Sequence, residues 1–380
     1  MKLLVLTTNY PRPDGSHQRM FVHVRDLYYK AQGLNVTVLN FTCPYDYEID
    51  GIRVISLSTF RHSHERYHIA LSHASNLRNH YLFLKRHAAD FPVIVFFFHG
   101  HEILYLNRDY PKPYPYLKSQ SIRGTALQDA YDHLKICLWR SYYRQLAPKS
   151  QFVFVSQWIK NRFTQNTGLT DSDLLGHCCI IHNSIGAAFE SESYDWSGEK
   201  TYDFITIRSD LDGSKYGVDL VVQLAERNAD QRFLLIGQGD FFVHNPKPVN
   251  LEWINTTLDH RAMLHYIDQA KCGLLLTRQD TQGVMTCELA AYGIPTITSD
   301  LPVCHEFFDE LPNVAMIPND YPDADIVGIS QVMRQNGPYP KDTCYFSQNT
   351  IAKEVELFHQ LWARHLSTHH ERSDFAECPI

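Results

Sequence analysis

Short apolar runs and amphipathic stretches alternate along the chain. Residues 3–7, four apolar residues and a threonine, and the continuous apolar run 93–98 have the length of buried strands. Between them, residues 20–30 place apolar side chains on one stripe, which predicts a helix. The alternation continues at 152–155 and begins again at 204–207. This pattern predicts an α/β protein in which helices cover both faces of parallel sheets.

The length of 380 residues is sufficient for two domains. Residues 191–201 are polar, include Gly198 and are typical of a linker, and a second series of strands starts just after them. We therefore expect a first domain over residues 1–190 and a second over residues 191–348. Residues 349–380 should form a helix that crosses back to the first domain, followed by a polar tail.

One stretch in the second half carries a chemical signal. A polar loop follows the apolar residues 274–276 and leads into the helix-forming residues 284–292, with Gly283 at the junction. Unpaired N–H groups at a helix N-terminus suit a phosphate, and a glycine permits close approach. Asp280 in the loop and Glu288 on the helix suit sugar hydroxyls instead. Together these groups indicate a nucleotide sugar, and the alternative is an ordinary strand–helix unit with an exposed acid at each end.

Asp280 and Glu288, with seven residues between them, resemble the Glu-x7-Glu motif of the retaining GT-B glycosyltransferases, family four in particular. The turn from Ala290 to Pro295 is similar to the Ala-x-x-Gly-x-Pro turn of that family. The resemblance implies that Glu288 binds the ribose hydroxyls and that Asp280 lies near the donor sugar, although Asp280 is one methylene shorter than the usual glutamate. It also implies donor-binding positions at the end of the loop: Gln282, Gly283 and Val284.

Two basic residues stand near the start of the second domain. Arg208 follows the apolar run 204–207, and Lys215 precedes a predicted helix. A guanidinium fork and an ammonium group beside a helix start suit a pyrophosphate. The pair is similar to the Arg, loop, Lys-Gly segment of the family, although Tyr216 separates Lys215 from Gly217. The resemblance implies that both cations stabilise the charge on the leaving nucleotide, and charges on a surface loop are the alternative.

The apolar run 93–98 ends at His99-Gly-His101. Ligands of open parallel sheets bind at the carboxyl ends of strands, where a histidine can contact a sugar hydroxyl or developing charge. The family has a histidine at the matching strand end, which makes His99 a catalytic candidate and His101 the second choice. A metal site is disfavoured, because two such residues rarely complete one alone. Gly15, after the first strand, either matches a donor-phosphate glycine of the family or is a turn glycine.

The net charge, the apolar runs and the cysteines limit which binding partners and which cellular compartment we expect for the chain. A net charge of −7 argues against a general nucleic-acid surface. No apolar run approaches the roughly eighteen residues that span a bilayer, and residues 1–8 are more typical of a buried strand than of a signal peptide. The nine cysteines show no CxxC spacing, which predicts reduced thiols in the cytosol.

Residues 61–89 hold a histidine-rich stretch and five basic residues, namely Arg61, Arg66, Arg78, Lys85 and Arg86. The preferred interpretation is a solvated helix face. The alternative is a face that meets anionic lipid headgroups or a pyrophosphate-linked acceptor.

The resemblance covers almost the whole chain and implies a GT-B fold, two Rossmann-like doubly wound domains facing across a cleft. It implies a retaining hexosyltransferase that moves a sugar from a UDP-linked nucleotide sugar to a glycan or lipid-linked saccharide acceptor, in bacterial surface polysaccharide synthesis. We expect no metal, since no DxD-type site is evident, and no other cofactor. We expect a cytoplasmic protein, peripheral on the inner face of the plasma membrane if residues 61–89 meet lipid. A nucleotide-sugar epimerase of the same fold and a non-catalytic nucleotide- or glycan-binding protein remain as alternatives.

Overall fold

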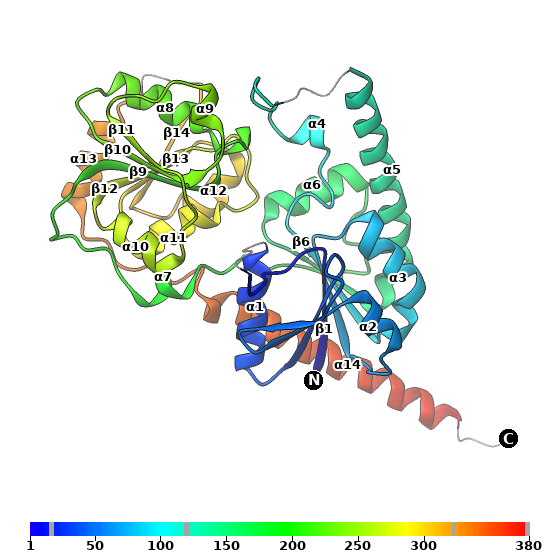
Figure 1. Cartoon of the computed structure of the whole chain (residues 1–380). Helices are drawn as coiled ribbons and strands as arrows, with labels where there is room; N and C mark the ends of the chain where they lie inside the picture. Colours follow the sequence, from blue (N-terminus) through cyan, green and yellow to red (C-terminus); the bar gives the residue numbers. More distant parts are fainter. Residues whose placement is uncertain (15–18, 118–121, 321–323, 377–380) are drawn as a thin grey trace. The chain divides into compact units, whose positions relative to one another are not determined.

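The computed structural model describes residues 1–14, 19–117, 122–320 and 324–376. The chain forms two compact units (Figure 1). The first unit contains Met1–Leu104, Tyr131–Asn183 and Ser347–Ile380, and the second contains Tyr105–Ala130 and Ser184–Phe346.

An eight-stranded sheet forms the centre of the first unit, in the order β3-β4-β2-β1-β5-β6-β7-β8. The strands are β1 (Lys2–Thr7), β2 (Asn35–Asn40), β3 (Tyr47–Ile49), β4 (Ile52–Ile55), β5 (Ile69–His73), β6 (Val93–Phe98), β7 (Ser150–Phe154) and β8 (Cys178–Ile180). All neighbours are parallel except β3 and β4, which form an antiparallel hairpin at one edge. The order of the strands reverses between β1 and β5.

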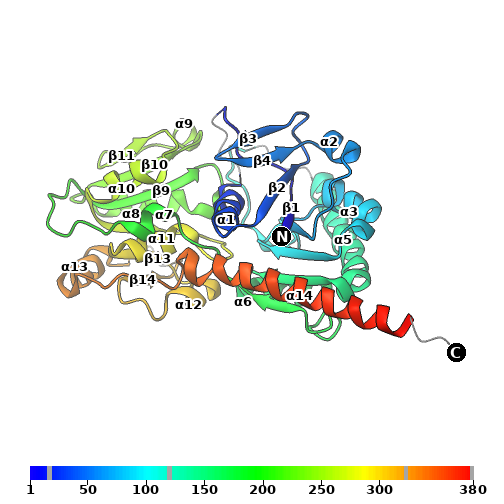
Figure 2. The same cartoon turned by 90° about the horizontal axis from the view of Figure 1, so that it is seen from below.

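Helices cover both faces of this sheet because successive residues of each strand point to opposite faces. On β6, Val95 and Phe97 pack into a core that α1 and α14 complete, and Phe96 and Phe98 pack against the ring of Tyr143 on α5. Figure 2 shows α14 and α1 on the first of these faces. The helices that belong wholly or partly to this unit are α1 (Met20–Ala31), α2 (Leu57–His62), α3 (Leu82–His87), α5 (Ile122–Leu146), α6 (Gln157–Thr167) and α14 (Ile351–Ala376).

A buried ion pair joins the first and last helices of the first unit. Arg25 Nε on α1 donates to Glu354 Oε1 on α14 at 3.0 Å, and the Tyr29 hydroxyl donates to the other oxygen of the same carboxylate. Arg25 Nη2 also donates to Asn183 Oδ1 at 2.9 Å. Asn183 is the last residue of the first unit before Ser184–Phe346 of the second unit, and α14 begins shortly after the chain returns at Ser347. The guanidinium of Arg25 therefore holds both Asn183 and the start of α14 within the first unit.

The second unit is built on a parallel six-stranded sheet in the order β11-β10-β9-β12-β13-β14. The strands are β9 (Tyr202–Asp210), β10 (Phe233–Gln238), β11 (Leu251–Ile254), β12 (Ala270–Leu275), β13 (Thr296–Ser299) and β14 (Val314–Ile317). The first three strands extend to one side and the last three to the other. The order therefore reverses between β9 and β12.

Two helical layers also cover this second sheet. Residues of α8 and α13 share one apolar core with β9, β10 and β12. In the other layer, Phe189 of α7 packs against His260 of α10 and Tyr292 of α11. The helices of the unit are α4 (Leu106–Asp109), α7 (Ala187–Ser191), α8 (Val218–Arg227), α9 (Phe241–His244), α10 (His260–Ile267), α11 (Val284–Tyr292), α12 (Pro302–Phe308) and α13 (Ile326–Asn336). Across the described ranges, no helix has the length and apolar character needed to cross a bilayer.

The predicted α/β class, with two parallel sheets, is confirmed. The compact units differ from the expected domain limits in three ways. The first unit ends at Asn183 instead of residue 190, because α7 packs with helices of the second unit. In addition, Tyr105–Ala130 belongs to the second unit, because Tyr114 is buried in the core of that unit. The return to the first unit begins at Ser347, two residues before the expected position 349.

The interpretation of residues 61–89 as a solvated helix is wrong for the middle of this stretch. Residues 69–73 form β5, which lies between β1 and β6 and is buried along its length. His73 and His80 are fully buried, and burial lowers the pKa of His80 to about 4. Histidines can be buried in this stretch because groups inside the fold contact their rings. The carbonyl oxygen of Leu6, for example, lies 3.2 Å from His80 Nε2. In the sequence, these histidines give the stretch the polar pattern of a solvated face.

Candidate functional site

Two loops of the second unit meet where the strand order reverses between β9 and β12. Ligands of open α/β sheets bind at the carboxyl ends of the strands at such a point. The loop after β9 and the loop after β12 are joined by hydrogen bonds: Thr277 Oγ1 and Arg278 N both donate to the carbonyl of Lys215, at 2.9 and 2.7 Å. The residues predicted to hold the donor lie on these loops, on the end of β9 or on α11, except for Gly15 and His99.

Arg208 stands near the end of β9 and is only 8% exposed. Its Nη2 donates to the carbonyl of Leu276 at 2.8 Å, whereas its Nε has no partner in the part of the chain that the structure describes. Burial lowers the pKa of the guanidinium, and the negative charge of Asp280 acts in the opposite direction. A buried cation with an unused N–H donor is suited to an anionic ligand.

Lys215 and Arg208 converge on one aromatic ring. The Lys215 ammonium lies 4.6 Å from the centroid of the Tyr216 ring, and the Arg208 guanidinium carbon lies 5.4 Å from it. The backbone after this pair is held closely: Gly217 has a φ of +60°, and a Cβ there would lie 3.1 Å from the carbonyl oxygen of Leu276. The two cations predicted for a pyrophosphate therefore lie close together, with a tight turn behind them.

The loop after β12 leads into an uncapped helix. Gly283 has a φ of +75° at the N-terminus of α11, and no side chain caps this helix. Asp280 Oδ1 accepts from the backbone of Thr281 at 2.7 Å and from that of Gln282 at 3.4 Å, so the carboxylate shapes the loop. The predicted phosphate position, at the helix start formed by Gly283 and Val284, fits this geometry. One oxygen of Asp280 therefore hydrogen-bonds the backbone of its own loop, in addition to the predicted contact of this residue with the donor sugar.

The side chain of Gln282 points into the second unit, so a contact of this residue with the donor would come from its backbone. Its side chain is only 1% exposed and hydrogen-bonds the Cys287 thiol. Burial raises the pKa of Cys287, and this hydrogen bond acts in the opposite direction. The side chain of Gln282 therefore packs inside the second unit, because the loop turns it away from solvent.

Glu288 is buried on α11, with 6% of its surface exposed. Its Oε1 accepts from the backbone N–H of Gly186 at 3.1 Å and lies 3.7 Å from His260 Nε2. Burial raises the pKa of this carboxyl to about 7, which the Gly186 bond only partly offsets. A Cβ on Gly186 would lie 2.1 Å from His260 Nδ1, so glycine is required for His260 to approach. The carboxylate thus gains from further hydrogen-bond donors, as ribose hydroxyls would supply.

His99 lies in the first unit, at the end of β6. Its Nε2 is 3.1 Å from Nδ1 of His73 at the end of the neighbouring β5, and its ring packs 4.5 Å from that of Phe21. Burial, followed by the influence of His73 and the positive charge of Arg25, holds the pKa of His99 well below its usual range. His99 is therefore a neutral imidazole at pH 7. Gly15, the predicted glycine of the loop after β1, lies outside the described residues.

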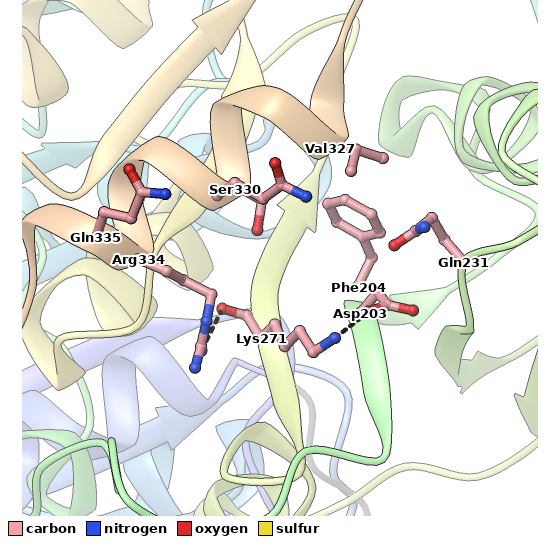
Figure 3. Close-up of a pocket in the computed structure, with 9 residues that line it drawn as sticks. Asp203, Phe204, Gln231, Lys271, Val327, Ser330, Arg334 and Gln335 are labelled. Atoms are coloured by element: carbon pink, nitrogen blue, oxygen red, sulfur yellow. Dashed lines mark hydrogen bonds and ion pairs between the residues drawn. The ribbon is translucent and has the colours of Figure 1, made fainter.

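A hollow of about 300 Å³ lies at the opposite, amino-terminal end of β9 and β12 (Figure 3). The Lys271 ammonium points across it to Asp203 Oδ1 at 2.7 Å, and Arg334 Nη1 contacts the carbonyl of Lys271 at 3.5 Å. The charged groups of this hollow are therefore paired with groups of the protein. It contains none of the residues predicted from the sequence.

Three further residues were missed by the sequence interpretation. Gln279 Nε2 is a buried donor with no partner among the described residues, as is the Nε of Arg208. Tyr216 was noted only because it separates Lys215 from Gly217, and His260 was not noted. Neither spacing nor residue type reveals that Tyr216 contacts Lys215 or that His260 approaches Glu288. Within the described ranges, no cluster of three or more His, Cys, Asp or Glu residues is arranged to hold a metal ion.

No family model matches the chain, and no curated protein matches it in sequence. Solved structures match it over nearly their whole length. Sucrose-phosphate synthase from Thermosynechococcus elongatus has a TM-score of 0.70 at 12% identity, over 96% of this chain and 99% of that one. WaaG, a glycosyltransferase involved in lipopolysaccharide biosynthesis, has a TM-score of 0.61 at 13% identity, over 94% and 99%. The pneumococcal O-GlcNAc transferase GtfA, in complex with UDP and GlcNAc, has a TM-score of 0.62 at 12% identity, over 95% and 99%.

These structures define the class of architecture. The chain is an α/β protein with the GT-B fold, as the sequence motif predicted. At these identities the likeness concerns the fold, and the assignment of an activity depends on the residues of the site.

Proposed function

We propose that the chain is a retaining glycosyltransferase of the family-four type. It transfers a hexosyl group from a UDP-linked nucleotide sugar to a glycan or lipid-linked saccharide acceptor in bacterial surface polysaccharide synthesis. The observation that carries this proposal is the unused Nε of the buried Arg208, next to Lys215 and at the switch point of the second sheet. The GtfA structure contains UDP, and WaaG acts in lipopolysaccharide biosynthesis, which supports the choice of donor and pathway.

Each group of the site binds a different part of the donor. Arg208 and Lys215 hold the diphosphate and stabilise the charge that grows on it as the glycosidic bond breaks. Gly283 and Val284 supply backbone N–H groups of α11 to a phosphate, and Glu288 accepts from the ribose hydroxyls. Because the two cations provide positive charge at the diphosphate, we assign no metal and no other cofactor.

Asp280 and His99 contact the donor sugar in this proposal. Because Nε2 of His99 contacts Nδ1 of His73, the other ring nitrogen of the neutral imidazole, Nδ1, is the one that contacts a sugar hydroxyl. Attack on the same face as the departing diphosphate, with a donor phosphate oxygen as the base, accounts for retention without a nucleophile from the protein.

We further propose a cytoplasmic protein that is peripheral on the inner face of the plasma membrane. The five basic residues Arg61, Arg66, Arg78, Lys85 and Arg86 are all exposed. An exposed basic group near an anionic surface contributes about 1 kcal/mol to binding. Sedimentation with vesicles that contain anionic lipid, compared with neutral vesicles, tests this contact.

The experiment that tests the function measures transfer and slow hydrolysis of the donor. Arg208→Ala and Lys215→Ala should each lower turnover by about two orders of magnitude or more, the usual result of removing charge stabilisation from a transition state. Arg227→Ala is the matched control, because Arg227 is exposed at the far end of the helix that follows Lys215. Normal turnover in both site variants would refute the assignment.

Two outcomes would favour the alternatives. Conversion of the donor into an epimer without an acceptor would indicate a nucleotide-sugar epimerase. Tight nucleotide binding without hydrolysis or transfer to any saccharide would indicate a non-catalytic binding protein.

A further inference from the structure

A segment that leaves β6 of the first unit packs as part of the second unit. We call residues 105–117 the tyrosine strap. Tyr114 is 8% exposed and belongs to the same apolar core as α8 and β9. Its ring stacks on that of Tyr116 at 5.7 Å and meets the edge of Phe241 at 5.1 Å. Leu117 packs against the same core, so the strap is anchored by its carboxyl end.

The two tyrosine hydroxyls of the strap both end on carboxylates. The Tyr114 hydroxyl donates to Asp219 Oδ1 at 2.7 Å, and the Tyr116 hydroxyl donates to Asp212 Oδ1 at 2.6 Å. The ring of Tyr116 also stacks on His244 at 4.5 Å. Burial and these carboxylates raise the pKa of both tyrosines, so each hydroxyl remains a donor at every physiological pH.

Asp219 links the strap to the loop that carries Lys215. Arg278 donates to both oxygens of Asp219, at 2.7 and 2.5 Å. Arg278 also donates from Nη1 to the carbonyl of Ser214 at 3.0 Å and from its backbone N–H to the carbonyl of Lys215 at 2.7 Å. Burial would raise the pKa of Asp219, but the donors Arg278 and Tyr114 outweigh it and lower the pKa. Asp219 is therefore an ionised bridge between strap and loop.

Asp212 links the strap to the start of the same loop and to the turn after β10. Both oxygens of Asp212 accept from the backbone N–H of Asp240, at 3.1 and 2.9 Å. A Cβ on Gly239 would lie 2.9 Å from Asp212 Oδ2, so the turn approaches the carboxylate very closely. Tyr116 and Tyr114 thus contact the loop on both sides of Lys215.

We propose that the tyrosine strap is a positioning element for the diphosphate subsite, and that Tyr114 and Tyr116 determine how strongly a nucleoside diphosphate binds without touching it. The inference rests on the proposed function, because it assumes that Lys215 and Arg208 hold a diphosphate. A fixed loop presents the Lys215 ammonium to the anion without a further loss of conformational freedom. A loop released from the strap loses part of the affinity for the second phosphate.

The test compares Tyr114→Phe, Tyr116→Phe and the double variant by titration calorimetry with UDP and with UMP. Tyr202→Phe is the matched control, because the Tyr202 hydroxyl donates to Glu252 Oε2 at 2.7 Å at the opposite end of β9. The double variant should raise the Kd for UDP about tenfold, as expected when hydrogen bonds to charged groups are lost, and should leave the Kd for UMP nearly unchanged. Tyr202→Phe should change neither Kd.

The ratio of the two dissociation constants separates positioning from general destabilisation. Equal losses of affinity for UDP and UMP, or an equal loss in Tyr202→Phe, would contradict the proposed role of the strap. The proposed function would not be affected. Unchanged UDP affinity in the double variant would also contradict the role of the strap alone. If UDP fails to bind the unaltered chain, the proposed donor fails, and the inference about the strap fails with it.

Discussion

The buried carboxyl of Glu288 makes a prediction that links stability to ligand binding. Burial raises its pKa from the ordinary 4.5 to about 7 in the folded chain. Below about pH 4.5 the carboxyl group is protonated in both the folded and the unfolded chain, and its burial does not lower the free energy of unfolding. As the pH rises toward 7, the unfolded chain loses the proton first, so the folded chain loses stability; above about pH 7 the cost is constant. At about 1.4 kcal/mol for each pKa unit, the full cost is about 3 kcal/mol.

Glu288→Gln removes this cost and keeps the carbonyl that accepts from Gly186 N–H. The free energy of unfolding of the variant, measured with urea, should exceed that of the unaltered chain by up to about 3 kcal/mol at pH 8.5 and by well under half of that near pH 5. The variant should also bind UDP more weakly, because a neutral amide is a poorer acceptor for ribose hydroxyls than a carboxylate.

Glu310→Gln is the control for the loss of one negative charge, since Glu310 is exposed in the same unit. It should show no such dependence on pH. Equal stability of Glu288→Gln and the unaltered chain at both pH values would refute the reasoning about burial. A gain in stability with unchanged UDP affinity would refute the ribose role alone.

Three other perturbations have definite expected results. Gly217→Ala should lower stability by about 1 kcal/mol in thermal unfolding and raise the KM for the donor, because a Cβ at φ +60° would lie 3.1 Å from the Leu276 carbonyl oxygen. Arg25→Ala should cost about 3–5 kcal/mol in urea unfolding, because it leaves the buried Glu354 carboxylate unpaired, and replacing both residues by apolar ones should recover most of that loss. His99→Gln should retain more turnover than His99→Ala, and the pH–rate profile between about pH 6 and 8 should show no ionisation of His99, since its pKa lies well below that range.

The strands and helices around the donor site could be predicted because local signals agree there. The apolar residues 274–276, the helix formers of 284–292 and Gly293 point to the same strand–helix unit, and α11 has the predicted limits. The carboxylate on α11 follows from the Asp280–Glu288 spacing, and the two cations follow from the separate Arg, loop, Lys segment at 208–217. In this part of the chain, local propensity and tertiary structure do not compete.

The first unit shows where such signals fail. β5 is a central strand that ends in Ser72 and His73, so it lacks the apolar run that revealed β6. Its two polar side chains are buried with partners of the fold: Ser72 hydrogen-bonds Ser75, and Nδ1 of His73 contacts Nε2 of His99, which is distant in sequence. A single-sequence pattern does not contain these pairings, so the buried histidines were assigned to a solvated face.

The roles of Gln282 and of the tyrosine strap also depend on tertiary contacts. The family resemblance implied a donor-binding position at Gln282, and the structure shows that its side chain turns inward to Cys287. The proline-rich sequence around Tyr114 gave no indication of the carboxylates that its tyrosines contact. Such contacts become visible only when Asp212 and Asp219 are placed in space.

The most direct test of the central claim is a thermal-shift comparison of UDP, GDP, ADP and CDP with the unaltered chain and Lys215→Ala. A ligand that binds only the folded chain at about 100 times its Kd adds about 2.7 kcal/mol of stability. We expect a clear rise in melting temperature with UDP, and we expect this rise to be lost in Lys215→Ala. No rise with any of the four nucleotides, or an equal rise in both proteins, would contradict the assignment of the diphosphate site.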